Sequence, residues 1–348
     1  MILLELSVMT QTIKWVQTRG LSISDQDRLA KALASSLAAR TRYAYSNHWK
    51  AFEEWATKGD YSTAPATPKV VAAHLAKLAE TASASTLRVR RAAIGAVHRA
   101  AGLPDPTASE IVKRALGGLV RQIGDIQRQA APLTATALDA IRTTAFSRRS
   151  GGQARQRRES AEAARRRGLV DIAICSVMRD ALLRREEAAV LTWGDIAEEA
   201  DGSGRLAVRR AKNDQEARGA LLYVGRQAMR DLAAIKSPNT KPSDTVFGLS
   251  GSQISRRIAA AAQAAELDGE FSGHSPRIGM AQDLAAHGIS LAELMQAGRW
   301  SSTSMPARYI RSQIAGRGGV AKYYAGRSDG GASLPESKCA PPTDARSK

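Results

Sequence analysis

The feature that most constrains the fold is a long stretch of helical pattern with no strand in it. From about Leu29 the sequence is rich in alanine, and the alternation of apolar and polar residues typical of a strand does not occur until after residue 200. The first strand-like segments are LAVR and ALLYV, which flank the polar turn AKNDQEARG within residues 205–224. The sequence therefore predicts a mainly α protein with one small β-hairpin in its second half.

Helical periodicity divides the first part of the chain into four expected helices, at 39–56, 69–80, 85–101 and 108–123. The first carries Tyr45, Trp49, Phe52 and Trp55 at spacings of three and four, so the rings share one face. Such a stripe favours a position in the core over stacking on bases.

A polar segment without apolar period, 125–133, is typical of an interdomain linker. We therefore expect an N-terminal extension (1–28), a helical domain (29–124), this linker (125–133), a second domain (134–325) and a disordered tail (326–348) rich in Gly, Ser, Pro and charge.

The charge of the chain indicates the kind of partner. Lys and Arg number 51 against 33 Asp and Glu, which gives a formal net charge of +18. Such a charge attracts polyanions, so nucleic acid is the expected partner and an anionic membrane surface the weaker alternative. No run of roughly 18 to 20 apolar residues predicts a membrane span. Two cysteines, Cys175 and Cys339, are too few for a disulfide framework or a four-ligand zinc site, and we expect a cytoplasmic protein.

Positive residues gather on three segments. The expected third helix carries Arg88, Arg90 and Arg91, and the fourth carries Lys113, Arg114 and Arg121. The segment from Ser147 to Gly168 holds eight Arg and two Glu, all of them in the run from Arg148 to Arg167. Each cluster fits contact with a phosphate backbone, but a solvated basic surface fits as well, and the sequence leaves both open.

The segment SGHSPRIGMAQDLAAHG predicts an anion site at a helix start. Ser275 is a good N-cap, Pro276 suits the first helical position and Gly288 suits the end. Arg277 then lies in the first turn, close to free backbone N–H groups and to His274. Further on, Ser290 and Glu293 form a capping box that opens a helix ending at Gly298, followed by Trp300 in the turn and by Tyr309.

Six residues in this order resemble the catalytic set of the tyrosine recombinases, or phage integrase family, and within it the Cre-type site-specific recombinases. They are Arg184 in LLRREEAAVL, Lys212 in RRAKNDQ, His274 and Arg277 in GHSPRIG, Trp300 in AGRWSS and Tyr309 in ARYIRS. The similarity extends almost throughout residues 273–311 and is looser in the first domain, in SNHWKAFEEW and HRAAGLPDP.

The resemblance implies a two-domain clamp on duplex DNA, in which a helical core-binding domain precedes the catalytic domain. It implies that Tyr309 attacks a phosphodiester to give a 3′-phosphotyrosyl link and a free 5′-hydroxyl, without metal or ATP. Arg184 and Arg277 would hold the phosphate oxygens, and Lys212 would protonate the leaving hydroxyl.

Other residues would support this chemistry. His274 would act as acid and base, Trp300 would donate its indole N–H, and Glu187 would orient Arg184. The implied partners are DNA with an inverted-repeat site, three further copies of the chain in a tetramer, and possible accessory proteins. The segment 316–325 resembles a C-terminal helix that packs either on a neighbouring protomer or on its own domain.

Alternatives remain within this set. Arg185 could replace Arg184, although Glu187 at +3 favours Arg184, and Tyr323 or Tyr324 could compete with Tyr309 as nucleophile. Pro306 requires a first helical turn or a loop just before Tyr309. A type IB topoisomerase or telomere resolvase would share the chemistry, and a non-catalytic DNA-binding regulator derived from a recombinase is a further possibility.

Overall fold

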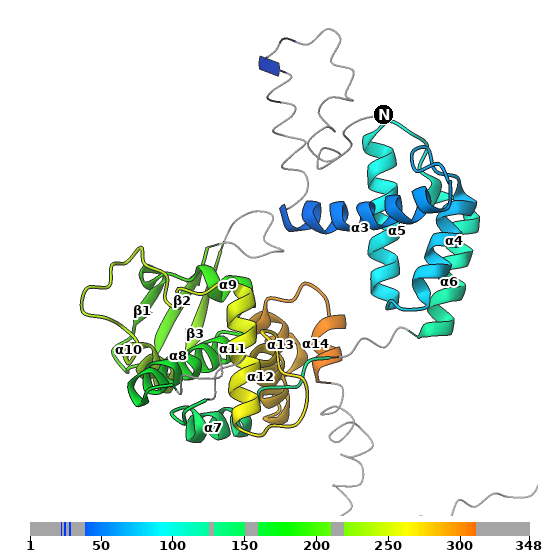
Figure 1. Ribbon diagram of the computed structural model, residues 1–348. Coiled ribbons are helices and arrows are strands. Elements are labelled where there is room, and N and C mark those ends of the chain that lie inside the picture. The colour runs from blue at the N-terminus through cyan, green and yellow to red at the C-terminus, as the bar shows by residue number, and fades with distance from the viewer. Residues whose placement is uncertain are drawn as a thin grey trace, which may run out of the picture. The chain divides into compact units, whose positions relative to one another are not determined.

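The computed structural model describes Ser22, Ser24, Asp25, Arg28 and residues 39–124, 129–149, 159–209 and 219–310. The chain forms two compact units, Met1–Arg128 and Gln129–Lys348, each with a hydrophobic core of its own (Figure 1). None of the helices in the described residues is long and apolar enough to cross a membrane.

The described part of the first unit is helical. Its helices are α3 (Ala39–Lys58), α4 (Pro68–Ala79), α5 (Ala84–Ala100) and α6 (Glu110–Ile123), with a 3-10 turn at Pro106–Ala108. Local signals set their starts: the side chain of Thr67 accepts from the N–H of Val70, and that of Ser83 accepts from the N–H of Thr86. The four helices expected from periodicity are therefore confirmed, with boundaries shifted by one or two residues.

The aromatic stripe of α3 lies in the core of this unit, as expected. Trp49 is 5% exposed, Phe52 is fully buried and Trp55 packs against the same cluster. Leu87 and Ile94 of α5 meet this face from the other side. Fully burying each such side chain contributes roughly 1.5 to 3 kcal/mol, so the stripe is a main source of the unit's stability.

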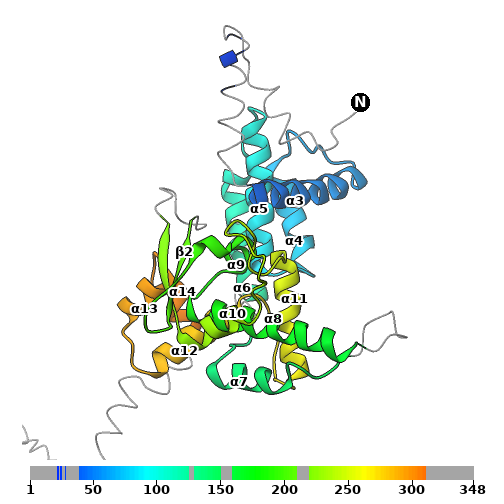
Figure 2. The same ribbon diagram turned by 90° about the vertical axis from the view of Figure 1, so that its left-hand side faces the viewer.

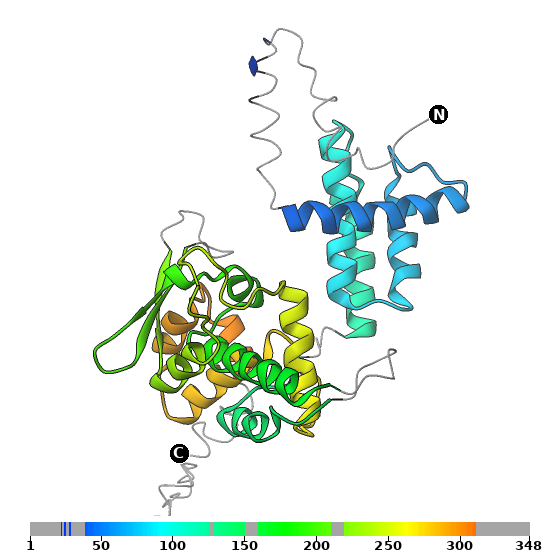
Figure 3. The same cartoon turned by 60° about the vertical axis from the view of Figure 1, so that its left-hand side comes forward.

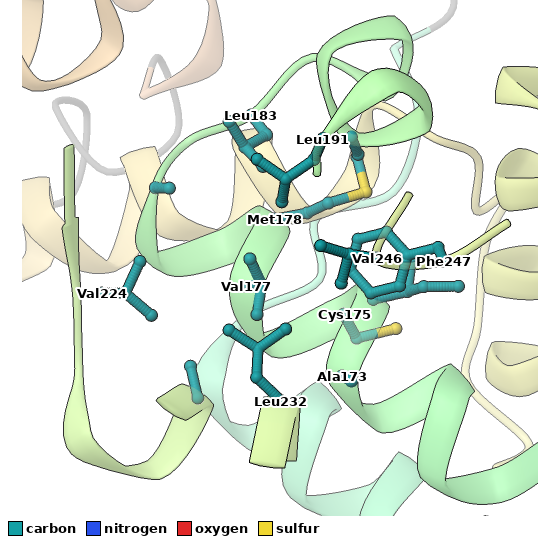
Figure 4. Packing of buried hydrophobic residues seen from close by; sticks show 14 of the residues in the cluster. Ala173, Cys175, Val177, Met178, Leu183, Leu191, Val224, Leu232, Val246 and Phe247 are labelled. Atoms are coloured by element: carbon teal, nitrogen blue, oxygen red, sulfur yellow. The ribbon is translucent and has the colours of Figure 1, made fainter. Parts of the chain in front are cut away.

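The second unit surrounds one central helix, α8 (Ala161–Asp180). The other helices are α7 (Ala135–Thr144), α9 (Arg185–Val190), α10 (Arg226–Ala233), α11 (Gly251–Ala264), α12 (Ser275–Ala286), α13 (Leu291–Gly298) and α14 (Ser304–Tyr309). Helix α8 is buried almost throughout its second half and contacts α7, α10, α11 and α12. Figure 4 shows its side chains Cys175, Val177 and Met178 packed against Leu232 and Val246.

Three antiparallel strands lie beside these helices, in the order β1 (Ile196–Glu198), β2 (Gly204–Val208), β3 (Ala220–Val224) (Figure 3). Leu206 pairs with Ile196 on one side and with Leu222 on the other, so these apolar residues share one face of the sheet. The expected hairpin strands are confirmed, but β1 was not predicted because three residues are too few for an alternating pattern. The hairpin turn with Lys212 lies outside the described residues.

The segment that enters the second unit is fixed to it. The N–H of Ala131 donates to the carbonyl of Glu270 (2.8 Å), and that of Leu133 donates to the carbonyl of Ser275 (2.9 Å). A Cβ on Gly279 of α12 would lie 1.9 Å from the carbonyl oxygen of Leu133, so only glycine permits this close crossing. Residues 131–133 therefore belong to the second unit, which corrects the linker of 125–133 expected from their polar composition. Residues 125–128 lie outside the described residues.

Candidate active site

The second unit brings Tyr309 and His274 into direct contact, although 35 positions separate them. Tyr309 ends α14 and is 4% exposed, and His274 is the N-cap of α12. The Oη atom of Tyr309 lies 2.5 Å from Nε2 of His274. Helices α12, α13 and α14 contact one another and hold this pair (Figures 1 and 2). Pro306 lies in the first turn of α14, where its missing N–H costs no helical hydrogen bond.

The start of α12 differs by one residue from the expectation. Ser275 was expected as N-cap because serine favours that position, but the structure has His274 there and Ser275 inside the helix, fully buried. The Ser275 hydroxyl accepts instead from the N–H of Ser272 at 2.9 Å, which closes the turn before the helix. Arg277 still falls in the first turn, as predicted.

Arg277 is held from several directions at once. It is 1% exposed and donates to the backbone carbonyls of Leu182 and Gly298. Its guanidinium carbon lies 4.5 Å from the ring centroid of Trp300, a cation–π contact, and the Trp300 ring lies 5.7 Å from that of Tyr309. A Cβ on Gly298 would lie 1.9 Å from the Trp300 ring, so this glycine is required for the tryptophan to fold back over the end of α13.

Arg184 approaches the same place from the start of α9. Glu187, 8% exposed, accepts from the Arg184 backbone N–H at 2.9 Å and from its Nη1 at 2.8 Å. Burial opposes the ionisation of Glu187, but hydrogen bonds from Arg299 and Arg184 outweigh it and lower the pKa of this carboxyl. Arg185 instead pairs with Glu186 at 3.1 Å and packs on Gly273. This geometry favours Arg184 over Arg185 at the site.

Two features of the site escaped the sequence reasoning. Arg299, 13% exposed, donates two hydrogen bonds to Glu187, and Leu182 has φ +43° and offers its carbonyl to both Arg277 and Arg299. The pairing of Arg299 with Glu187 spans 112 positions, so no local pattern predicts it. The only available signal was a cation at the C-terminus of a helix.

The electrostatics of the pair follow from burial among cations. Burial, and then the charges of Arg277, Arg184 and Arg185, lower the pKa of His274 to about 4, so its imidazole is neutral at pH 7. Burial raises the pKa of Tyr309 despite the opposing effect of Arg277 and Arg184, so the phenol is protonated. In the tautomer that carries its proton on Nδ1, the neutral imidazole accepts at Nε2 the hydrogen bond that the phenol donates.

The cationic groups around this pair can bind an anion. Burial, Arg184 and Arg299 lower the pKa of Arg277 to about 9, which leaves its guanidinium charged at neutral pH. Guanidiniums with fixed donors suit the oxygens of a phosphate group. Within the described ranges, no group of three or more His, Cys, Asp or Glu side chains could hold a metal ion.

The expected DNA-binding residues of the first unit are not all at its surface. Arg88, Lys113, Arg114 and Arg121 are exposed, whereas Arg91 donates to the carbonyl of Thr107 through Nε and Nη2. Arg90 is 7% exposed, with Nη1 2.7 Å from Nε2 of His74 and Nε donating to Nδ1 of His48. Arg90 is therefore part of the bundle interior, which corrects its expected place on a basic surface.

Two arginines of the Arg148 to Arg167 run turn inward, whereas Arg148, Arg165 and Arg166 are exposed. Arg149 and Arg167 lie 3.0 and 3.4 Å from Asp171, which is 1% exposed, and Arg257 of α11 lies 2.7 Å from the same carboxylate. Arg257 therefore holds α11 to α8, and Arg149 holds the segment after α7 to the same helix. Residues 150–158 lie outside the described residues, as do segment 316–325, Tyr323, Tyr324 and the tail 326–348.

Known families and proteins match most of the chain. The Phage integrase family matches residues 154–315, and its N-terminal SAM-like domain matches residues 30–102. An integrase/recombinase xerD homolog of Selenomonas ruminantium is 24% identical over 314 residues, which are 83% of this chain and 87% of that protein. Recombinase cre of Escherichia phage P1 is 24% identical over 312 residues, 78% of this chain and 86% of its own length.

Solved structures share the fold. XerH site-specific recombinase, in a post-cleavage complex with its palindromic difH substrate, has a TM-score of 0.59 at 12% identity, covering 91% of this chain and 94% of its own. The Tn1549 transposon integrase in complex with transposon right end DNA has a TM-score of 0.55 at 12% identity, covering 90% and 99%. With both domains matched in order, the chain belongs to the phage integrase family, the tyrosine recombinases.

Proposed function

We propose that this protein is a site-specific recombinase that cleaves and rejoins duplex DNA through a 3′-phosphotyrosyl link to Tyr309. The observation that carries the proposal is the 2.5 Å contact between Tyr309 and a neutral His274, set among Arg184, Arg277 and Trp300. A protonated phenol is a weak nucleophile, and a neutral imidazole at hydrogen-bond distance is positioned to take its proton.

The cleavage step has a definite balance of bonds. The Tyr309 Oη–P bond forms as its proton passes to Nε2 of His274, while the bond from phosphorus to the 5′ oxygen breaks and that oxygen takes a proton. Lys212 is our candidate for the acid because the family resemblance places it there. Attack by a 5′-hydroxyl of another strand reverses the step, and the phosphotyrosine conserves the bond energy, so rejoining requires no ATP.

The arginines stabilise the charge that develops during this step. Arg184 and Arg277 would each donate to a non-bridging oxygen, and Trp300 would add its indole N–H. Arg277 is also buried before the phosphate enters and Arg184 is already held by Glu187, so little reorganisation is needed. We expect the protein to act in the cytoplasm, as a tetramer on two copies of an inverted-repeat site, with accessory proteins where the site requires them.

The test is a covalent adduct on a strained substrate. Duplexes that the protein retains from a random-sequence library supply the binding site, and a nick placed within the site allows the cleaved strand to diffuse away, so the adduct accumulates. Wild-type protein is expected to form the adduct, whereas Tyr309→Phe, which keeps the ring but removes the hydroxyl, is expected to bind the duplex and form none. An adduct that survives Tyr309→Phe would place the nucleophile elsewhere.

A further inference from the structure

Arg299 occupies an unusual backbone position beside the site. It is the C-cap of α13, with φ +55° and ψ +47°, the left-handed region that favours glycine. Its side chain is 13% exposed and turns inward rather than toward solvent. Within the described part of the chain, its Nε–H is buried without a hydrogen-bond partner. A strained backbone and a buried donor without a partner both carry a cost, and such outliers point to a functional constraint.

The side chain of Arg299 shares one acceptor with Arg184. Nη2 of Arg299 donates to Oε2 of Glu187 at 2.8 Å, and Nη1 donates to Oε1 at 3.2 Å. Nη1 of Arg184 donates to the same Oε1 at 2.8 Å. Oε2 also accepts from the Arg184 backbone N–H at 2.9 Å, so each carboxylate oxygen already has two donors, and no acceptor site remains for a second bond from the Arg184 guanidinium.

Arg299 shares a second acceptor with Arg277. The carbonyl of Leu182 accepts from Nη2 of Arg299 at 3.3 Å and from Nη1 of Arg277. Leu182 itself has φ +43°, a rare conformation for leucine, which directs its carbonyl. Arg299 is therefore linked by one shared atom to each of the two arginines that we assign to the phosphate.

We propose that Arg299 is a positioning residue that keeps the guanidiniums of Arg184 and Arg277 in place for one phosphate. This inference rests on the proposed function. Without Arg299, one acceptor site on each oxygen of Glu187 becomes free, and the Arg184 guanidinium can rotate into a two-bond fork with that carboxylate, away from the phosphate. Arg277 would at the same time lose the neighbour that shares its carbonyl acceptor.

The experiment compares Arg299→Gly with Arg299→Lys on the nicked duplex selected above. Glycine accepts the left-handed backbone, so Arg299→Gly removes the guanidinium without adding strain. Glu266→Gly is the matched control, because Glu266 is exposed, lies in the same unit and has φ +53°. We expect adduct formation to slow about 100-fold in Arg299→Gly, the scale of a misplaced reacting group, and to remain unchanged in Glu266→Gly.

Two further readouts separate positioning from structural support. The affinity for the duplex is measured in proteins that carry Tyr309→Phe and cannot cleave it. Adding Arg299→Gly should change this affinity by no more than about twofold relative to Tyr309→Phe alone, because many phosphate contacts share the binding free energy. Low millimolar guanidinium should partly restore the rate of Arg299→Gly, and Arg299→Lys should fall between glycine and wild type because it keeps the charge without the fork.

The outcomes separate a failure of the positioning role of Arg299 from a failure of the proposed recombinase function. A wild-type rate in Arg299→Gly, or a loss of rate matched by an equal loss of duplex affinity and insensitive to guanidinium, would overturn the positioning role while leaving the recombinase intact. Failure of the wild-type protein to form an adduct on any selected nicked duplex would overturn the recombinase proposal, and the inference with it.

Discussion

Each unit of the molecule buries an arginine, and the two are satisfied in opposite ways. Arg90 in the first unit is 7% exposed and meets two histidine rings, whereas Arg277 in the second is 1% exposed and meets two backbone carbonyls. Burial lowers the pKa of both arginines, but only for Arg277 do other cations contribute to the shift. Arg90 therefore joins helices through its histidine partners, whereas Arg277, grouped with Arg184 and Arg299, can form a site for an anion.

The largest effect should come from exchanging the two arginines for lysine, one at a time. Arg277→Lys keeps the charge but loses the fork, and we expect adduct formation on the nicked duplex to fall about 1,000-fold, the upper scale for losing a donor to a developing oxyanion. Arg90→Lys should change the rate less than threefold when assayed well below its unfolding temperature. Equal losses of the rate of adduct formation in Arg277→Lys and Arg90→Lys would show that the two arginines do not differ in role.

Arg90→Lys should instead lower stability. An ammonium cannot reach both imidazoles with the geometry of a guanidinium, and each buried polar group left without a partner costs about 1 to 3 kcal/mol. Thermal unfolding of the full chain, with amide hydrogen exchange across α3–α6, would show the loss in the first unit. Unchanged exchange there would mean that the histidine contacts contribute little.

Acid should weaken the first unit through His74. Burial, and then the charge of Arg90, lower the pKa of His74 from 6.5 to about 4, and the ring is 4% exposed. The neutral ring therefore stabilises the folded state fully above pH ~6.5, and this contribution of about 3 kcal/mol is lost as the pH falls toward 4. Hydrogen exchange in α4 and α5 should rise over that range in wild type. The rise should be smaller in His74→Gln, which cannot take up a proton, and an identical rise in both proteins would exclude His74 as the cause.

The smallest effect should distinguish Arg90 from its exposed neighbour Arg88. If Arg88 contacts a phosphate, Arg88→Ala should lower the slope of log affinity against log salt by about 1. Arg90→Lys should leave the slope unchanged, because its side chain is inside the bundle. A reduced slope for Arg90→Lys but not for Arg88→Ala would reverse this assignment.

Periodicity predicted the four helices of the first unit, and the capping box of Ser290 and Glu293 predicted α13, because both signals need only neighbouring residues. The inward position of Arg90 was also open to prediction, since Leu87 and Ile94, three before and four after it, mark the buried face of α5. The composition of α5 does not show this, because three arginines close together in sequence predict one basic surface unless the helical period is applied to each of them.

The site could be predicted as a set of residues but not as a geometry. The order of Arg184, His274, Arg277, Trp300 and Tyr309 carried the resemblance, and the structure brings these residues together. Arg299 was not in the expected set, because its pairing with Glu187 exists only once α9 and the end of α13 are folded against each other. An acceptor shared by residues that lie far apart in the sequence cannot be predicted from local periodicity.

The most direct test of the central claim is to locate the DNA on the protein. Wild-type protein trapped on the nicked duplex would be digested with trypsin, and the nucleotide-bearing peptide identified by mass spectrometry. Arg308 and Arg311 place Tyr309 in the peptide 309–311, whereas Tyr323 and Tyr324 fall together in the peptide 323–327. The account predicts the DNA on residue Tyr309, and its recovery on the peptide 323–327 would contradict it.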